Sequence, residues 1–125
     1  MKNPPDTLYQ SMPMTNEIRQ QEVIQIINST LCKRLSDETS CLLHQKALNL
    51  ITAAIKANEL SIPTDSYSKY KGCVEISNKI LLKIESLKKS KQPNVHLLLQ
   101  AITEMLHDYR QQMDEALSNL RPLIR

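Results

Sequence analysis

The sequence predicts an all-α fold: an antiparallel four-helix bundle (up-down-up-down) with a flexible N-terminal arm and a long C-terminal helix. The 125 residues include a single Gly, at position 72, and no Asn-Gly or Asp-Gly pair, so the turn dipeptides of tight β-hairpins are missing. Leu, Ile, Lys, Gln, Glu and Ala dominate, and most of these are good helix formers. Four amphipathic segments follow one another with short links, which is the pattern of a bundle.

The first 15 residues are predicted to form the flexible arm. They contain Pro4, Pro5 and Pro13, three of the six prolines of the chain. The arm also carries apolar side chains that could dock on the body or on a partner: Leu8, Tyr9, Met12 and Met14. Residues 16–125 are predicted to form one helical-bundle domain.

The first two helices are expected to be antiparallel neighbours. One begins at Thr15 or Asn16 and runs to about Leu35, because apolar residues recur in it at spacings of three and four. Ser36 or Asp37 can cap the second helix, which spans about 38–58. A link of only two or three residues then forces the helices side by side. The second helix is the most apolar, so it is expected to be surrounded by the others.

The third helix is predicted over about 65–89. Pro63 disfavours helical geometry at the preceding residue, and Thr64 or Asp65 can cap this helix. Gly72 lies near its first turns, where the missing side chain would permit a close helix crossing. Gln92 and Pro93 end the segment.

The last helix carries an uninterrupted heptad seam. Asn94 is a good cap for it, and Pro122 limits it at about Leu120 or Arg121. The seam alternates spacings of four and three through Val95, Leu99, Ile102, Leu106, Tyr109, Met113, Ala116 and Leu120. At ~1.5 Å per residue this helix is about 40 Å long, against about 30 Å for the first two. We therefore expect its first half to pack internally and its second half to offer apolar surface to a second chain.

The function predicted from this surplus length is that of a non-catalytic helical protein-binding module. Such a module is an adaptor, a chaperone or an inhibitor of a partner protein or enzyme, acts through helix–helix packing, and here is expected to self-associate, as a homodimer. Tyr is common at binding hot spots, and the three Tyr beyond the arm are expected at the edges of the core with their hydroxyls outward. The predicted binding residues are Tyr109, Arg110, Met113, Leu117, Leu120, Leu123 and Ile124.

The alternative function is that of a nucleic-acid-associated regulator. Its basic face would lie on the third helix and comprise Lys79, Lys83, Lys88, Lys89 and Lys91. A stripe of lysines of this kind can contact the phosphate groups of a nucleic acid. Base reading favours Arg and stacking aromatic rings, and this segment has neither, so nucleic acid is the less favoured partner.

Catalytic and metal chemistry find little support in the sequence. Glu104 and His107 form one Glu-x-x-His motif, but di-metal bundles need two, and the seam turns both residues outward. Cys41 and His44 could supply half a zinc site, yet no second pair has matching spacing. There is no glycine-rich phosphate loop or nucleophile elbow. We therefore predict no enzyme activity and no metal or other cofactor, with His44 as a hydrogen-bonded core residue.

The expected location is a reducing cytoplasm. Cys32, Cys41 and Cys73 are odd in number and unpaired in spacing, so they are read as inert core thiols rather than as a disulfide framework. The beginning of the chain has no apolar signal segment, and no run is long enough to span a membrane. Unconventional export stays open. The net charge of +3 is mild. The frequent use of Ile, Lys, Asn and Gln is compatible with an AT-rich bacterial genome.

Overall fold

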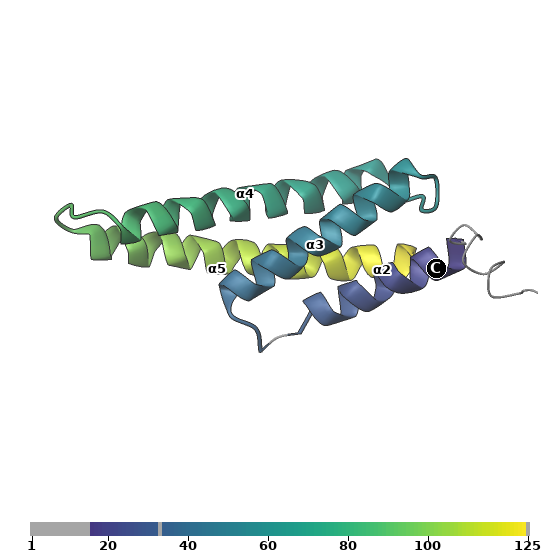
Figure 1. The fold of residues 1–125 in the computed structure, drawn as a ribbon, viewed down its shortest axis with the longest axis horizontal. Helices are drawn as coiled ribbons and strands as arrows, with labels where there is room; N and C mark the ends of the chain where they lie inside the picture. The colour runs from purple at the N-terminus through teal and green to yellow at the C-terminus, as the bar shows by residue number, and fades with distance from the viewer. Residues whose placement is uncertain (1–15, 33, 125) are drawn as a thin grey trace, which may run out of the picture.

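The computed structural model describes residues 16–32 and 34–124, and these form a four-helix bundle (Figure 1). The helices are α2 (Asn16–Thr30), α3 (Asp37–Lys56), α4 (Thr64–Lys88) and α5 (Val95–Leu120), followed by the 3₁₀ helix η1 (Arg121–Leu123). Consecutive helices run in opposite directions (Figure 1), and the described residues contain no strand. The predicted all-α bundle is thereby confirmed. The predicted arm, residues 1–15, lies outside the described residues.

The link between α2 and α3 is longer than the sequence predicts. α2 ends at Thr30, well before Leu35, so six residues separate it from α3. The Thr30 hydroxyl donates to the carbonyl of Ile26 at 2.6 Å, and such back-bonding competes with the helical ladder. Ser36 caps α3 as predicted, because its Oγ accepts from the backbone N–H of Thr39 at 3.2 Å.

The other helix ends use backbone geometry more than side-chain caps. α3 closes with Asn58 in the left-handed region, at φ 60°, and the N–H groups of Glu59 and Leu60 donate to the carbonyl of Ala54. α4 begins directly after Pro63, without the cap expected from Thr64 or Asp65. Asn94 precedes α5 as predicted, but it is left-handed, at φ 64°, and makes no side-chain cap bond.

The core lies where all four helices overlap. α4 and α5 form the most extensive pair, and α2 with α3 packs across one end of that pair (Figure 1). Arg19 of α2 pairs with Glu59 in the α3–α4 link at 3.1 Å, and Arg121 donates to Asn28 of α2 at 2.9 Å. The largest fully buried apolar side chains are Tyr70, Ile27, Ile51, Leu106, Met113, Leu117, Leu120, Val23 and Val74.

Two further observations concern α4 and the helices as a whole. A Cβ added to Gly72 would meet no atom within 4 Å, so the predicted close helix crossing at this residue is wrong. Within the described part of the chain, no helix combines the length and the apolar character required to cross a bilayer.

Candidate functional site: the uncovered end of the α4–α5 hairpin

The end of the α4–α5 hairpin projects beyond α2 and α3 (Figure 1). α4 has 25 residues and α5 has 26, against 15 in α2 and 20 in α3. Asp37, the first residue of α3, contacts His107 and Arg110 on α5. The part of α5 before His107, about three turns, therefore lies past the start of α3. We call residues 79–106 the tip.

Some apolar side chains of the tip are buried, whereas others are exposed to solvent. Ile80, Ile84 and Leu87 of α4 are buried. By contrast, α5 contains no buried residue before Leu106. The large exposed apolar side chains of the tip are Leu82 (67%), Leu97 (56%), Leu98 (47%) and Met105 (50%). They are four of the seven such residues in the described part of the chain, so exposed apolar side chains concentrate on this end of the molecule.

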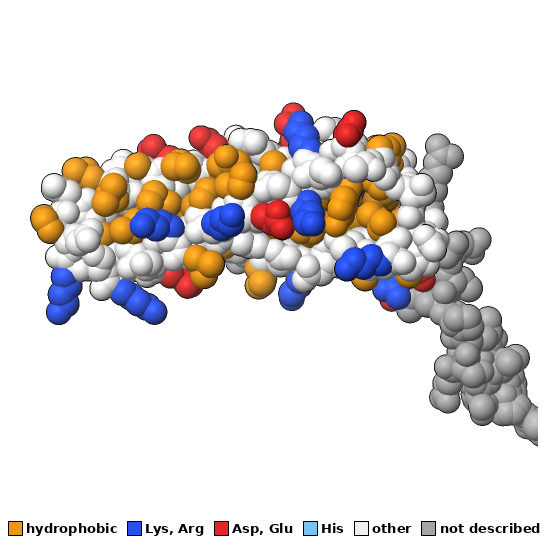
Figure 2. Space-filling view, turned by 90° about the horizontal axis from the view of Figure 1, so that it is seen from above, with side chains coloured by type: hydrophobic (Ala, Val, Ile, Leu, Met, Phe, Trp, Pro, Cys, Tyr) orange, Lys and Arg blue, Asp and Glu red, His pale blue; other side chains and the backbone are white. Residues whose placement is uncertain are grey.

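All five lysines of the predicted basic face lie on the tip and are exposed: Lys79, Lys83, Lys88, Lys89 and Lys91. Lys88 reaches Glu38 at 3.6 Å, with both side chains largely in solvent. None of the other four has a carboxylate within ion-pair distance among the described residues. Figure 2, which looks down on α4, shows basic and hydrophobic side chains interspersed along this face.

The sequence analysis predicted exposed apolar surface in the second half of α5, but in the structure most of the exposed large apolar side chains of α5 lie in its first half. Of the predicted binding residues, Met113, Leu117 and Leu120 are fully buried in the core. Ile124 is also buried, and Tyr109 packs against the core from a half-buried position. Only Leu123 is exposed. The physical reason is that α2 and α3 cover the second half of α5, whereas the first half extends past them.

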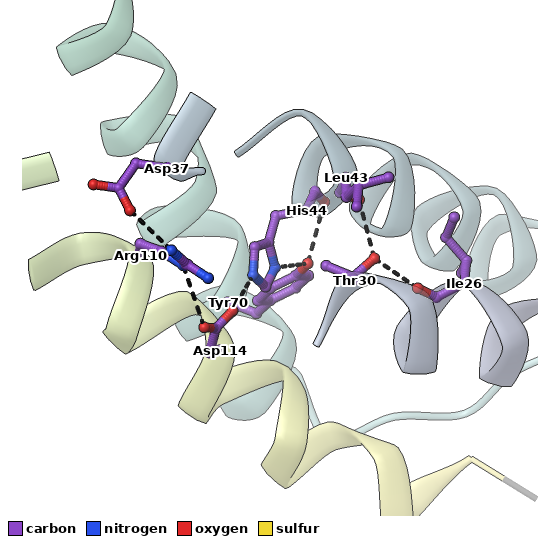
Figure 3. A network of polar contacts seen from close by, with 8 residues as sticks. All are labelled: Ile26, Thr30, Asp37, Leu43, His44, Tyr70, Arg110 and Asp114. Carbon is purple, nitrogen blue, oxygen red and sulfur yellow. Dashed lines mark hydrogen bonds and ion pairs between the residues drawn. The ribbon is translucent and has the colours of Figure 1, made fainter. Parts of the chain in front are cut away.

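Arg110, the remaining residue of that set, belongs to a polar network at the base of the tip (Figure 3). Its guanidinium lies 3.1 Å from Oδ1 of Asp37 and 3.7 Å from Oδ2 of Asp114, and only 11% of the side chain is exposed. His107 Nδ1 lies 3.6 Å from the same Asp37 oxygen. Asp37 and Arg110 thus fix the start of α3 against the middle of α5.

His44 is the buried centre of this network. Its Nε2 lies 2.6 Å from Oδ1 of Asp114, and its Nδ1 lies 2.8 Å from the hydroxyl of Tyr70. The Tyr70 hydroxyl donates to the backbone carbonyl of His44 at 3.1 Å. The prediction that His44 is a hydrogen-bonded core residue is confirmed. Both ring nitrogens are engaged within the protein, so the network joins α3, α4 and α5.

Tyr70 differs from its predicted place at the edge of the core. The side chain is fully buried and its hydroxyl points inward (Figure 3). Burial raises the pKa of Tyr70, and the nearby Asp114 carboxylate raises it further. In a core without Phe or Trp this ring takes the place of a large apolar side chain, with His44 supplying the partner for its hydroxyl.

The cysteines divide into two environments. Cys41 and Cys73 are buried as predicted, whereas Cys32 is exposed in the α2–α3 link. Burial raises the pKa of Cys41 to about 11, with a contribution from the Asp37 carboxylate, and burial also raises the pKa of Cys73. Cys32 is exposed because α2 ends before reaching it, which corrects its assignment to the core.

The residues considered for metal binding are separated by the fold. Glu104 and His107 are exposed, whereas Cys41 and His44 are buried with His44 already bonded at both nitrogens. Among the described residues no group of three or more His, Cys, Asp or Glu side chains is arranged to hold a metal ion.

The surface that sequence reasoning missed is the apolar part of the tip. Leu97, Leu98 and Met105 lie in the half of α5 that was expected to be internal. The difference in helix length indicated that part of α5 extends past the other helices, but not which part. No protein-family model, no curated protein and no solved structure matches this chain.

Proposed function

We propose that the chain is a helical protein-binding module that occupies a surface of another protein, with the tip as its binding surface. The observation that carries this proposal is the exposure of Leu82, Leu97, Leu98 and Met105 on the hairpin end that projects beyond α2 and α3. Clustered exposed apolar side chains mark interaction sites more often than single ones do. The binding mode is helix-on-helix or helix-in-groove packing.

The polar network supports this use of the tip. Asp37, Arg110, His44 and Asp114 join the start of α3 to the middle of α5, directly below the projecting turns. A hairpin fixed at its base presents its side chains in a defined arrangement, which lowers the entropy lost on binding. None of the three cysteines forms a disulfide, and we place the protein in a reducing compartment such as the cytoplasm.

The test compares two tagged variants in capture from a nuclease-treated lysate. Leu98→Gln with Met105→Gln removes apolar surface from the tip without changing charge. Leu42→Gln removes a similarly exposed Leu from α3, outside the tip. Each apolar side chain buried at an interface contributes roughly 1.5–3 kcal/mol, so the double variant should lose affinity at least tenfold.

A protein retained near stoichiometrically by the wild type and by Leu42→Gln, but not by the tip variant, supports the proposal. Circular dichroism must show that both variants keep their helix content. Equal capture by all three proteins, or no protein captured by any of them, contradicts it.

The second candidate function is a nucleic-acid-associated regulator, and the exposed lysines of the tip favour it. Lys79, Lys83, Lys89 and Lys91 have no carboxylate partner among the described residues. The tip contains no Arg, Phe, Tyr or Trp. Its lysines could contact phosphates, but it has no aromatic ring or guanidinium on which a base could stack. Substitution of Lys83, Lys88 and Lys89 by Gln should then flatten the salt dependence of binding to DNA or RNA. Absence of binding at low salt removes this function.

A further inference from the structure

We infer that the partner of the tip is an amphipathic helix whose apolar stripe is flanked by acidic residues. This inference rests on the proposed function and adds the chemistry of the partner. The apolar surface alone would not select one partner. The selection comes from the charge that accompanies it: Lys79 and Lys83 lie beside Leu82 on α4, and the other exposed apolar side chains of the tip lie on α5, the second helix of the same hairpin.

The spacing along α4 brings the two kinds of side chain together. Lys79 and Leu82 are three residues apart on α4, and Lys89, which follows the helix in αR geometry, is seven residues beyond Leu82, so the three lie along one side of it. Leu82 is therefore bracketed by lysines on its own stripe. Lys83 is next to Leu82 in sequence and extends the basic rim to the neighbouring face.

The tip holds most of the unbalanced charge of the chain. It carries five lysines and only two carboxylates, Glu85 and Glu104, so its formal charge equals the +3 of the whole chain. Four of these lysines have no partner among the described residues. A surface with uncompensated positive charge around apolar side chains attracts a partner with the opposite arrangement and disfavours a basic one.

A second copy of this chain fits the same surface less well. Two tips placed face to face would bring two sets of unpaired lysines together, and like charges at an interface are costly. Nucleic acid would use the lysines but gain little from Leu98 and Met105, which are on the other helix of the hairpin. An acidic amphipathic helix uses both the charge and the apolar side chains.

The test is a selection that does not presuppose the answer. A displayed library of helical peptides, with a fixed apolar stripe and all flanking positions random in charge, is enriched on the intact protein. Counter-selection on Leu98→Gln with Met105→Gln removes peptides that bind elsewhere. Enriched peptides should carry Asp or Glu at the flanking positions, and their affinity should fall about tenfold between low and physiological salt.

The charge variant is Lys79→Gln with Lys83→Gln and Lys89→Gln. It should weaken the selected peptides about tenfold, while a matched change of Lys46, Lys56 and Lys69 to Gln, exposed lysines outside the tip, should not. Enrichment of neutral or basic flanks, or of no peptide at all, overturns the inference. So does binding that is restricted to DNA, to vesicles of anionic lipid, or to a second copy detected by sedimentation equilibrium.

These outcomes are distinct from failure of the proposed function. A captured protein that requires Leu98 and Met105 but is unaffected by the charge variant would leave the binding module standing and overturn only the acidic partner. Loss of the tip dependence in the lysate capture would overturn both.

Discussion

His44 and Asp114 are 70 residues apart in sequence, yet Nε2 of the imidazole lies 2.6 Å from Oδ1 of the carboxylate. The imidazole is fully buried, whereas 29% of the Asp114 side chain is exposed. Asp114 thus connects the buried imidazole to Arg110, and through it to Asp37. Buried polar groups joined in this way specify one register between helices that apolar packing alone would leave free to slide.

We expect Asp114→Ala to lower the free energy of unfolding by about 1–3 kcal/mol, because it leaves His44 Nε2 buried without its acceptor. Urea denaturation followed by circular dichroism measures the change. Asp108→Ala is the matched control, since Asp108 is exposed on the same helix, and it should stay within about 0.5 kcal/mol of the wild type. Equal effects of the two substitutions would mean that the contact contributes no net stability.

Stability should fall at alkaline pH. The pKa of Cys41 rises from 9.0 to about 11 in the folded chain, and the pKa of Tyr70 rises as well. Since these groups lose their protons more readily when unfolded, the free energy of unfolding is unaffected below pH 9 and decreases above it. Urea denaturation at pH 8, 9 and 10.5 follows this loss. Cys41→Ala should show a shallower decrease with pH, and an unchanged slope would exclude Cys41 as a cause.

The three thiols should differ in their reaction with Ellman's reagent. Cys32 is exposed, whereas Cys41 and Cys73 are buried and have raised pKa values, which lowers their thiolate fraction. The native protein should therefore release one equivalent quickly and the other two slowly, and guanidinium should release all three together. Cys32→Ser should abolish the fast phase. A fast phase that persists in this variant would show that a second thiol is accessible.

The helices could be predicted because helix formation depends largely on local interactions, which the composition and the spacing of apolar residues reflect. The four helices, the Ser36 cap and the buried His44 follow from spacing within a few turns. Helix ends were less predictable. α2 ends at Thr30, whose hydroxyl donates to the carbonyl of Ile26, and the spacing of apolar residues does not indicate such a bond.

The location of the exposed surface was not predictable from the seam of α5. The seam continues unchanged from Val95 to Leu120, so the pattern alone does not say which half is covered. That depends on the length of α2 and α3 and on where Asp37 meets α5. Likewise, Tyr70 and His44 lie on different helices, and the sequence of neither helix indicates that their side chains form a hydrogen bond.

Gly72 offers the last prediction, because it is a helical glycine without a structural reason for being one. It lies inside α4 with φ outside the left-handed region, and an added Cβ would meet nothing within 4 Å. Ala in its place reduces the conformational entropy of the unfolded chain without a steric cost. We expect Gly72→Ala to raise the free energy of unfolding by about 0.5–1 kcal/mol, measured by urea denaturation with an unchanged m value. Destabilisation would contradict this prediction and show that an added Cβ does meet neighbouring atoms of the folded chain.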